Sequence, residues 1–117
     1  MTRLFKAFFN SADGLLHALR SEEAIRQEFV LLLLAVPLAC LLTADNWKRI
    51  ALIGLVFALI AVELLNTCVE KLCDHVTPDR HPEIKIVKDM GSAAVLFAII
   101  ATGLFWCLAI MERLGLA

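Results

Sequence analysis

The sequence predicts an all-helical protein that crosses a membrane three times. Hydrophobic residues make up 61% of the 117 residues and the mean hydropathy is +0.81, a larger apolar share than soluble domains usually have. Most charged residues cluster at 2–28, 45–49 and 70–89, with long apolar runs between them. A bilayer imposes such a separation because a charged side chain in hydrocarbon is costly. We therefore expect one membrane domain, residues 1–117.

Residues 2–20 predict an amphipathic helix that lies in the membrane interface. Apolar residues recur at helical spacing along one face: Leu4, Phe5, Phe8, Phe9, Ala12, Leu15, Leu16 and Leu19. The opposite face is polar and mostly basic: Arg3, Lys6, Asn10, Asp13, His17 and Arg20. A helix with phenylalanines on one side and basic residues on the other is typical of an interfacial helix. Gly14 is expected to bend or break it, because glycine is a poor helix former.

Three membrane-spanning helices are expected at about 27–44, 49–73 and 88–112. Phe29–Ala44 carries no charge but is shorter than the roughly 20 residues that a crossing needs. The polar turn before it would complete the span. Met90–Met111 is uncharged and long enough to cross on its own.

The boundaries of these helices have local signals. Ser21 is expected to cap the helix that leads into the first span, and Asp45 is expected to cap the second. A loop at 74–86 should follow the second span, because Pro78 and Pro82 interrupt regular structure there.

Lysine and arginine are distributed unevenly between the two predicted sides of the membrane. One side would carry Arg3, Lys6, Arg20, Arg26, Lys71, Arg80, Lys85 and Lys88, and the other Lys48, Arg49 and Arg113. Because cytoplasmic segments carry the excess of these residues, the N-terminus and the 74–86 loop are expected in the cytoplasm and the C-terminus outside. The net charge of -1 gives no basic field for a nucleic acid, so no nucleic-acid partner is expected.

Glu63 is the most informative residue for function, since an ionisable side chain inside an apolar span is rare and usually functional. Asn66 and Glu70 follow on the same face of the predicted helix, at i+3 and i+7. Glu22, Glu28, Lys88 and Asp89 are expected at the same cytoplasmic side. Two carboxylates at an interface can hold Mg²⁺ together with phosphate oxygens, and a buried acid can take a proton from a hydroxyl.

Simpler interpretations of these residues remain open. Glu22 could form an ordinary i,i+4 ion pair with Arg26, and Glu63 could hydrogen-bond a neighbouring helix. Lys88 and Asp89 could be ordinary interfacial residues. The glycines at 14, 54, 91, 103 and 115 cannot form a glycine-rich phosphate loop, so a nucleotide would have to be held by side chains at the membrane surface.

Three segments resemble sequence signatures of the prokaryotic diacylglycerol kinase family. They are Glu63-Leu64-Leu65-Asn66-Thr67 with Glu70 and Asp74, then Lys88-Asp89-Met90-Gly91-Ser92-Ala93-Ala94-Val95, and the stretch Glu22, Ala24 and Arg26-Gln27-Glu28. The resemblance covers nearly the whole chain. It implies a homotrimer of subunits with three spans and a surface helix each, in a bacterial inner membrane. It also implies a lipid kinase that uses ATP and Mg²⁺.

The resemblance assigns roles to residues by their motif positions. The implied catalytic residues are Glu63, as proton acceptor, with Asn66 and Lys88, and the implied metal ligands are Glu22 and Glu70. The implied nucleotide contacts are Arg3, Asn10, Glu22, Glu70, Asp79, Arg80, His81, Lys88 and Asp89. The implied lipid-substrate contacts are Glu63, Ser92, Ala24 and Glu28.

The activity implied by the resemblance is phosphorylation of diacylglycerol by ATP to give phosphatidic acid. Undecaprenol kinase is the alternative within the same family. A small proton-coupled exporter is an alternative of another class, but such proteins usually have four spans and do not need Asn66, Glu70 and Lys88 on one face. A purely structural membrane oligomer is the third alternative.

Overall fold

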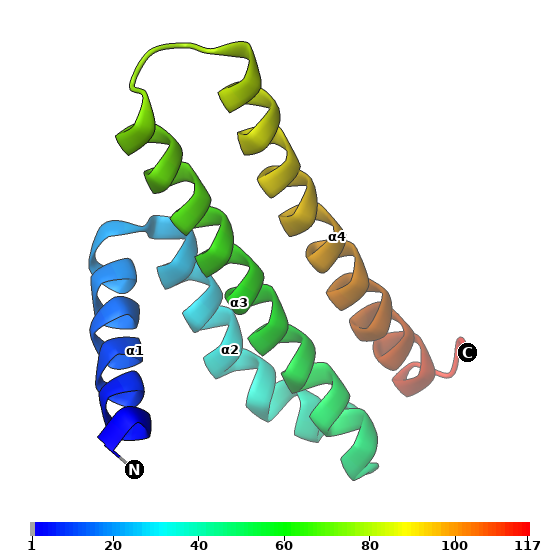
Figure 1. Cartoon of the computed structure of the whole chain (residues 1–117). Helices are drawn as coiled ribbons and strands as arrows, with labels where there is room; N and C mark the ends of the chain where they lie inside the picture. Colours follow the sequence, from blue (N-terminus) through cyan, green and yellow to red (C-terminus); the bar gives the residue numbers. More distant parts are fainter. Residues whose placement is uncertain (1) are drawn as a thin grey trace.

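The computed structural model describes residues 2–117 as four α-helices joined by short connections (Figure 1). They are α1 (Thr2–Ser21), α2 (Glu23–Leu42), α3 (Asn46–Val76) and α4 (Pro82–Arg113). Each of α2, α3 and α4 is long and apolar enough to cross a membrane. The predicted all-helical architecture with three candidate spans is therefore confirmed.

Helix α3 is the central element of the bundle. It packs extensively against both α2 and α4, whereas α2 and α4 contact each other only weakly. Helix α1 folds back beside α2 (Figure 1). Because successive spans run in opposite directions, α2 begins at the end of the bundle where α3 ends and α4 begins (Figure 1).

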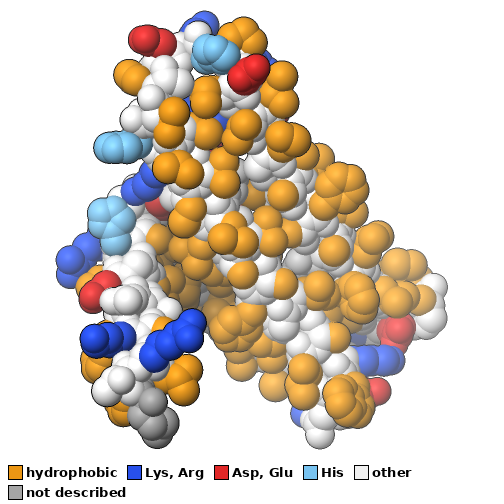
Figure 2. All heavy atoms as spheres, viewed as in Figure 1, with side chains coloured by type: hydrophobic (Ala, Val, Ile, Leu, Met, Phe, Trp, Pro, Cys, Tyr) orange, Lys and Arg blue, Asp and Glu red, His pale blue; other side chains and the backbone are white. Residues whose placement is uncertain are grey.

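The outer surface is largely hydrophobic. Figure 2 shows hydrophobic side chains over the middle of the bundle and charged side chains toward its ends and along α1. Leu33 and Phe97 are 74% and 72% exposed. Such a surface would be unfavourable in water, but lipid chains cover it in a bilayer.

Small residues bring the three spans together in the interior. Ala39 of α2 is fully buried and lies in one cluster with Leu52 of α3 and Ala109 of α4. Trp106 of α4 packs against this cluster and donates its indole N–H to the carbonyl of Leu52 at 3.1 Å. Alanine permits close helix contact in a membrane, where the attraction between helices comes from packing and hydrogen bonds.

The expected cap at Asp45 is confirmed, because its carboxylate accepts a 2.9 Å hydrogen bond from the backbone N–H of Trp47. Arg49 then donates from its guanidinium to the carbonyl oxygens of Thr43 and Cys40, which closes the C-terminal end of α2. Lys48 forms a 2.8 Å ion pair with Glu112 of α4. Side chains from the start of α3 thus hold the ends of both neighbouring spans.

The expected N-cap at Ser21 is wrong. Ser21 is the last residue of α1, and its hydroxyl donates to the carbonyl oxygen of His17 at 2.9 Å. A serine inside a helix can make this i−4 bond, so it need not end the helix by capping the next one. Glu22 instead occupies the N-cap position of α2, with no side-chain cap hydrogen bond. Helix α1 also continues without a break through Gly14.

The expected loop at 74–86 is too long, because α3 continues to Val76 and α4 already begins at Pro82. Proline is well tolerated at the first position of a helix, where its missing N–H would have had no partner. His81 caps the helix by accepting the backbone N–H of Glu83 at its Nδ1, at 3.2 Å. The connection is therefore confined to residues 77–81.

Replacing Ala39 by leucine tests this packing. Ala39→Leu is expected to lower the free energy of unfolding by about 1–3 kcal/mol, because the added side chain has no space between the three spans. Unfolding in detergent by increasing SDS, followed by circular dichroism, measures the change. Ala58→Leu adds the same volume at an exposed position of α3 and should have little effect. An equal decrease in the free energy of unfolding in the two variants would contradict the arrangement of the bundle.

Candidate functional site

Four carboxylates gather at the end of the bundle where α2 begins. Glu22 lies 3.5 Å from Lys71, the residue that follows Glu70, so the start of α2 faces the half of α3 that carries Glu63 and Glu70. Glu22 and Glu28 come from the start of α2, and Glu63 and Glu70 share one face of α3. Gathering like charges is unfavourable unless protons or cations neutralise them. The cluster is therefore suited to taking up a proton or a cation.

The cluster extends from the interior of the bundle toward its exposed end. Glu28 is buried, Glu63 is half-buried and Glu70 is exposed. Glu63 lies about 10 Å deeper than Glu70 along the helix axis, at roughly 1.5 Å per residue. Within residues 2–117, two buried side-chain oxygens lack a hydrogen-bond partner, Oε2 of Glu28 and Oδ1 of Asn66. Such atoms are uncommon in folded proteins, and here both belong to the predicted site.

Asn66 connects the cluster to α4. Its amide nitrogen donates to Oε1 of Glu70 at 3.2 Å, and the side chain is buried against the glycine at position 91. A Cβ on residue 91 would overlap Oδ1 of Asn66. Gly91 belongs to the Lys88–Val95 segment that the sequence analysis singled out, but its contact with Asn66 could not be foreseen from the sequence.

Several predicted nucleotide contacts line one pocket of about 560 Å³ at the connection between α3 and α4. They are Asp79, Arg80, His81 and Lys88. Lys88 forms a 2.6 Å ion pair with Asp74 of α3, so its ammonium group lies toward the end of that helix. Asp89 lies outside the pocket lining and pairs with Lys85 at 2.6 Å. The exposed basic side chains here can attract phosphate groups.

Glu22 does not pair with Arg26. The Arg26 guanidinium donates to the carbonyl oxygens of Leu19 and Arg20, at 2.9 and 3.1 Å, and so closes the C-terminal end of α1. Glu22 lies 3.5 Å from the ammonium group of Lys71 on α3, a contact that sequence reasoning did not foresee. Partly exposed pairs of this kind contribute little to stability, so the Glu22 carboxylate stays available to a ligand.

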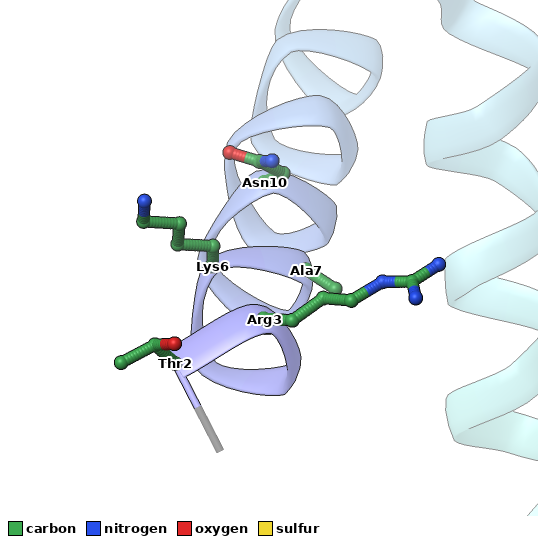
Figure 3. A pocket seen from close by; sticks show the side chains of 5 residues that line it. All are labelled: Thr2, Arg3, Lys6, Ala7 and Asn10. Carbon is green, nitrogen blue, oxygen red and sulfur yellow. The ribbon is translucent and has the colours of Figure 1, made fainter.

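Arg3 and Asn10 lie elsewhere in the chain. They line a depression of about 420 Å³ together with Thr2, Lys6 and Ala7, all from α1. Arg3 extends toward the neighbouring helix, whereas Lys6 points to the other side (Figure 3). The start of α1 lies well away from the α3–α4 connection (Figure 1). One chain therefore does not bring Arg3 and Asn10 to Asp79, Arg80 and His81.

The remaining predicted lipid contacts are exposed. Ala24 lies in the first turn of α2, near Glu22, and Ser92 follows Gly91 on α4. Both positions are exposed and lie toward the carboxylate end of the bundle.

The donor set fits a hard cation with few protein ligands. Among residues 2–117, no three or more His, Cys, Asp and Glu side chains are grouped to hold a metal ion. Glu22 lies beside Lys71, the residue that follows Glu70, so the two carboxylates are at the same end of the bundle. Mg²⁺ commonly takes one or two carboxylates and completes its shell with substrate phosphates and water. The two glutamates match that pattern.

Comparison with known proteins identifies the family. The family model described as "Prokaryotic diacylglycerol kinase" matches residues 9–110. The diacylglycerol kinase of Escherichia coli strain K12 is 42% identical over 97% of this chain and 93% of its own length. Those of Helicobacter pylori strain J99 and Pseudomonas aeruginosa strain PAO1 are 40% and 37% identical over 89% and 91% of this chain, and over 81% and 86% of their own lengths. The chain belongs to the prokaryotic diacylglycerol kinase family.

Proposed function

We propose that the protein transfers the γ-phosphoryl group of ATP to the hydroxyl of diacylglycerol, giving phosphatidic acid and ADP. The observation that carries the proposal is the placement of Glu22, Glu28, Glu63 and Glu70 toward one end of the bundle. It lies in a chain whose curated relatives are named diacylglycerol kinases over nearly its full length. A proton-coupled exporter would use a membrane glutamate, but it would not need the pocket with Arg80, Lys85 and Lys88 at the α3–α4 connection.

Glu63 is the proposed proton acceptor. As the lipid hydroxyl oxygen forms its bond to the γ-phosphorus, its proton passes to the Glu63 carboxylate. The bond between the γ-phosphorus and the bridging oxygen breaks, and ADP leaves. A half-buried carboxylate on a lipid-facing bundle can meet a hydroxyl whose acyl chains remain in hydrocarbon. Glu28, Ala24 and Ser92 would orient the lipid around it.

Glu22 and Glu70 are the proposed ligands for Mg²⁺, which when bound neutralises phosphate charge. Asn66 would orient Glu70 through its amide hydrogen bond. Lys88 would offset the negative charge that develops during transfer, since cationic side chains directed at a transferring phosphoryl group stabilise the transition state. Asp79, Arg80, His81 and Asp89, with Arg3 and Asn10, would contact the nucleotide.

The working unit is proposed to be a homotrimer whose subunits, residues 1–117, each form a single domain. Small exposed residues on α4, among them Ala93 and Ala94, permit close contact with another helix. The separation of Arg3 and Asn10 from the α3–α4 pocket also favours a site completed by another copy. In the bacterial inner membrane, the excess of lysine and arginine would put the N-terminus and the 74–86 segment in the cytoplasm and the C-terminus outside.

Glu63→Gln is expected to slow phosphoryl transfer by at least about 10²-fold, the usual scale for loss of a general base, because an amide cannot accept the proton. The fold should survive, since a neutral amide is easier to bury than a carboxylate. The measurement is transfer of labelled phosphate from ATP to diacylglycerol in mixed micelles. Glu23→Gln, at an exposed position of α2, is the control. Turnover close to that of the parent in Glu63→Gln would disprove the assignment.

Glu22→Gln and Glu70→Gln are each expected to raise the Mg²⁺ concentration that gives half the maximal rate, because each removes an anionic oxygen ligand. Loss of a group that only orients a metal ligand typically costs about 10- to 100-fold in metal affinity or activity, so loss of a ligand should cost at least as much. Titration of the activity against Mg²⁺ at saturating ATP measures the shift, again with Glu23→Gln as control. An unchanged requirement in both variants would remove the metal role of these glutamates.

Cross-linking of the purified protein in detergent is expected to give a trimer as the largest specific product. Ala94→Phe and Ala98→Phe should reduce the amount of trimer, because a large side chain prevents close contact between α4 and a helix of another subunit. Leu116→Phe, beyond the end of α4, should leave the cross-linked products unchanged. A fully active monomer would contradict the proposed assembly.

Diacylglycerol is expected to be phosphorylated faster than undecaprenol at equal mole fraction. Its small neutral head can reach the depth of Glu63, about 10 Å below Glu70 by helix rise, while its chains stay in hydrocarbon. A competition assay with both lipids in the same micelles, and chromatographic separation of the products, decides between them. Preferential labelling of undecaprenol would change the substrate and leave the kinase chemistry in place.

A further inference from the structure

Gly91 of α4 lies against the Asn66 side chain of α3, in the part of the bundle that carries the carboxylates. An added Cβ would overlap Oδ1 of the Asn66 side chain on α3. At Gly14, Gly54 and Gly103, by contrast, an added Cβ would meet no atom within 4 Å. The space left by the absent side chain at position 91 is therefore filled by Asn66, whereas the space beside these other helical glycines is empty.

The orientation of the Asn66 amide follows from its partner on the other side. Glu70 offers carboxylate oxygens, which accept hydrogen bonds, so the Asn66 NH₂ group must face it, and the 3.2 Å bond has that direction. Oδ1 then points toward α4, where it is buried and has no hydrogen-bond partner. The Cα of glycine carries only hydrogens, and a Cα–H group is a weak donor to a carbonyl oxygen at such helix contacts.

We propose that Gly91 is a positioning residue for the metal-binding carboxylate. By leaving space for the carbonyl of Asn66, it fixes the amide of that residue and, through the amide hydrogen bond, the carboxylate of Glu70. Gly91 itself touches neither ATP nor lipid in this role. The inference rests on the proposed function, in which Glu70 holds the divalent ion.

A purely structural glycine would behave differently on substitution. Alanine is a better helix former than glycine, so Gly91→Ala would stabilise α4 if position 91 had no close neighbour. With Asn66 in place, the new methyl group must displace the amide, and the Glu70 carboxylate loses its fixed orientation. Gly103→Ala on the same helix is the matched control, since its methyl group meets nothing within 4 Å.

The first readout is the side-chain amide of Asn66 itself. The chain contains three asparagines, at positions 10, 46 and 66, so selective ¹⁵N labelling of asparagine gives a simple NMR spectrum in detergent. Asn66→Ala assigns the relevant signals by their loss. Gly91→Ala is expected to shift them, and Gly103→Ala is expected to leave them in place. Unmoved Asn66 signals in Gly91→Ala would overturn the inference, whatever the kinase assay gives.

The second readout is binding of Mn²⁺, measured by electron paramagnetic resonance with a non-hydrolysable ATP analogue and without turnover. Gly91→Ala is expected to weaken Mn²⁺ binding by about 10-fold, the lower end of the usual effect of losing a group that orients a metal ligand. The double variant Asn66→Ala with Gly91→Ala should bind no more weakly than Asn66→Ala alone, because both changes break the same contact.

The outcomes separate the inference from the proposed function. The positioning role of Gly91 would be overturned if Gly91→Ala bound Mn²⁺ as tightly as Gly103→Ala. It would also be overturned if the losses of Mn²⁺ affinity in the two single variants added up in the double variant. Parent-like Mn²⁺ binding by Glu70→Gln would instead overturn the metal role of Glu70, which belongs to the proposed function.

Discussion

The structure depends on α3 packing between α2 and α4 at the same time. Because α2 and α4 contact each other only weakly, each is held in place through α3. Small side chains make this possible, because Ala39 and Ala109 let the two outer helices approach Leu52. The hydrogen bond from Trp106 to the Leu52 carbonyl adds a directional contact in a region where lipid offers no competing partner.

The two ends of the bundle differ in how their polar groups are satisfied. At the end where α3 begins, Asp45 caps the helix, Arg49 binds the last carbonyls of α2, and Lys48 pairs with Glu112. At the other end, Glu28 and Asn66 each keep a buried oxygen without a partner, and Glu63 lies among like charges. Unpaired buried groups cost stability, and enzymes commonly keep such groups where a substrate or an ion completes them. The difference is what the proposed function would lead one to expect, with a structural role at one end and the chemistry at the other.

The candidate site combines elements that are close in space and separated in sequence. Glu22 comes from the corner between α1 and α2, and this corner is held by Arg26 and Lys71 through contacts that span helices. The pocket at the α3–α4 connection owes its form to the early start of α4 at Pro82, with His81 as its cap. Both corners lie toward the C-terminal end of α3, the end at which Glu70 lies, so the positions of short connections decide which side chains can act together.

By itself the sequence determined the helices, the three candidate spans and the sharing of one face by Glu63, Asn66 and Glu70. These features follow from periodicity and from the cost of charge in hydrocarbon, which act within one segment. Only the tertiary structure decided that Glu22 contacts Lys71 instead of Arg26, that Ser21 ends a helix, and that Asn66 requires a glycine on α4. Those outcomes depend on distances between helices. A local pattern does not contain such distances, because packing of the three spans against one another sets them.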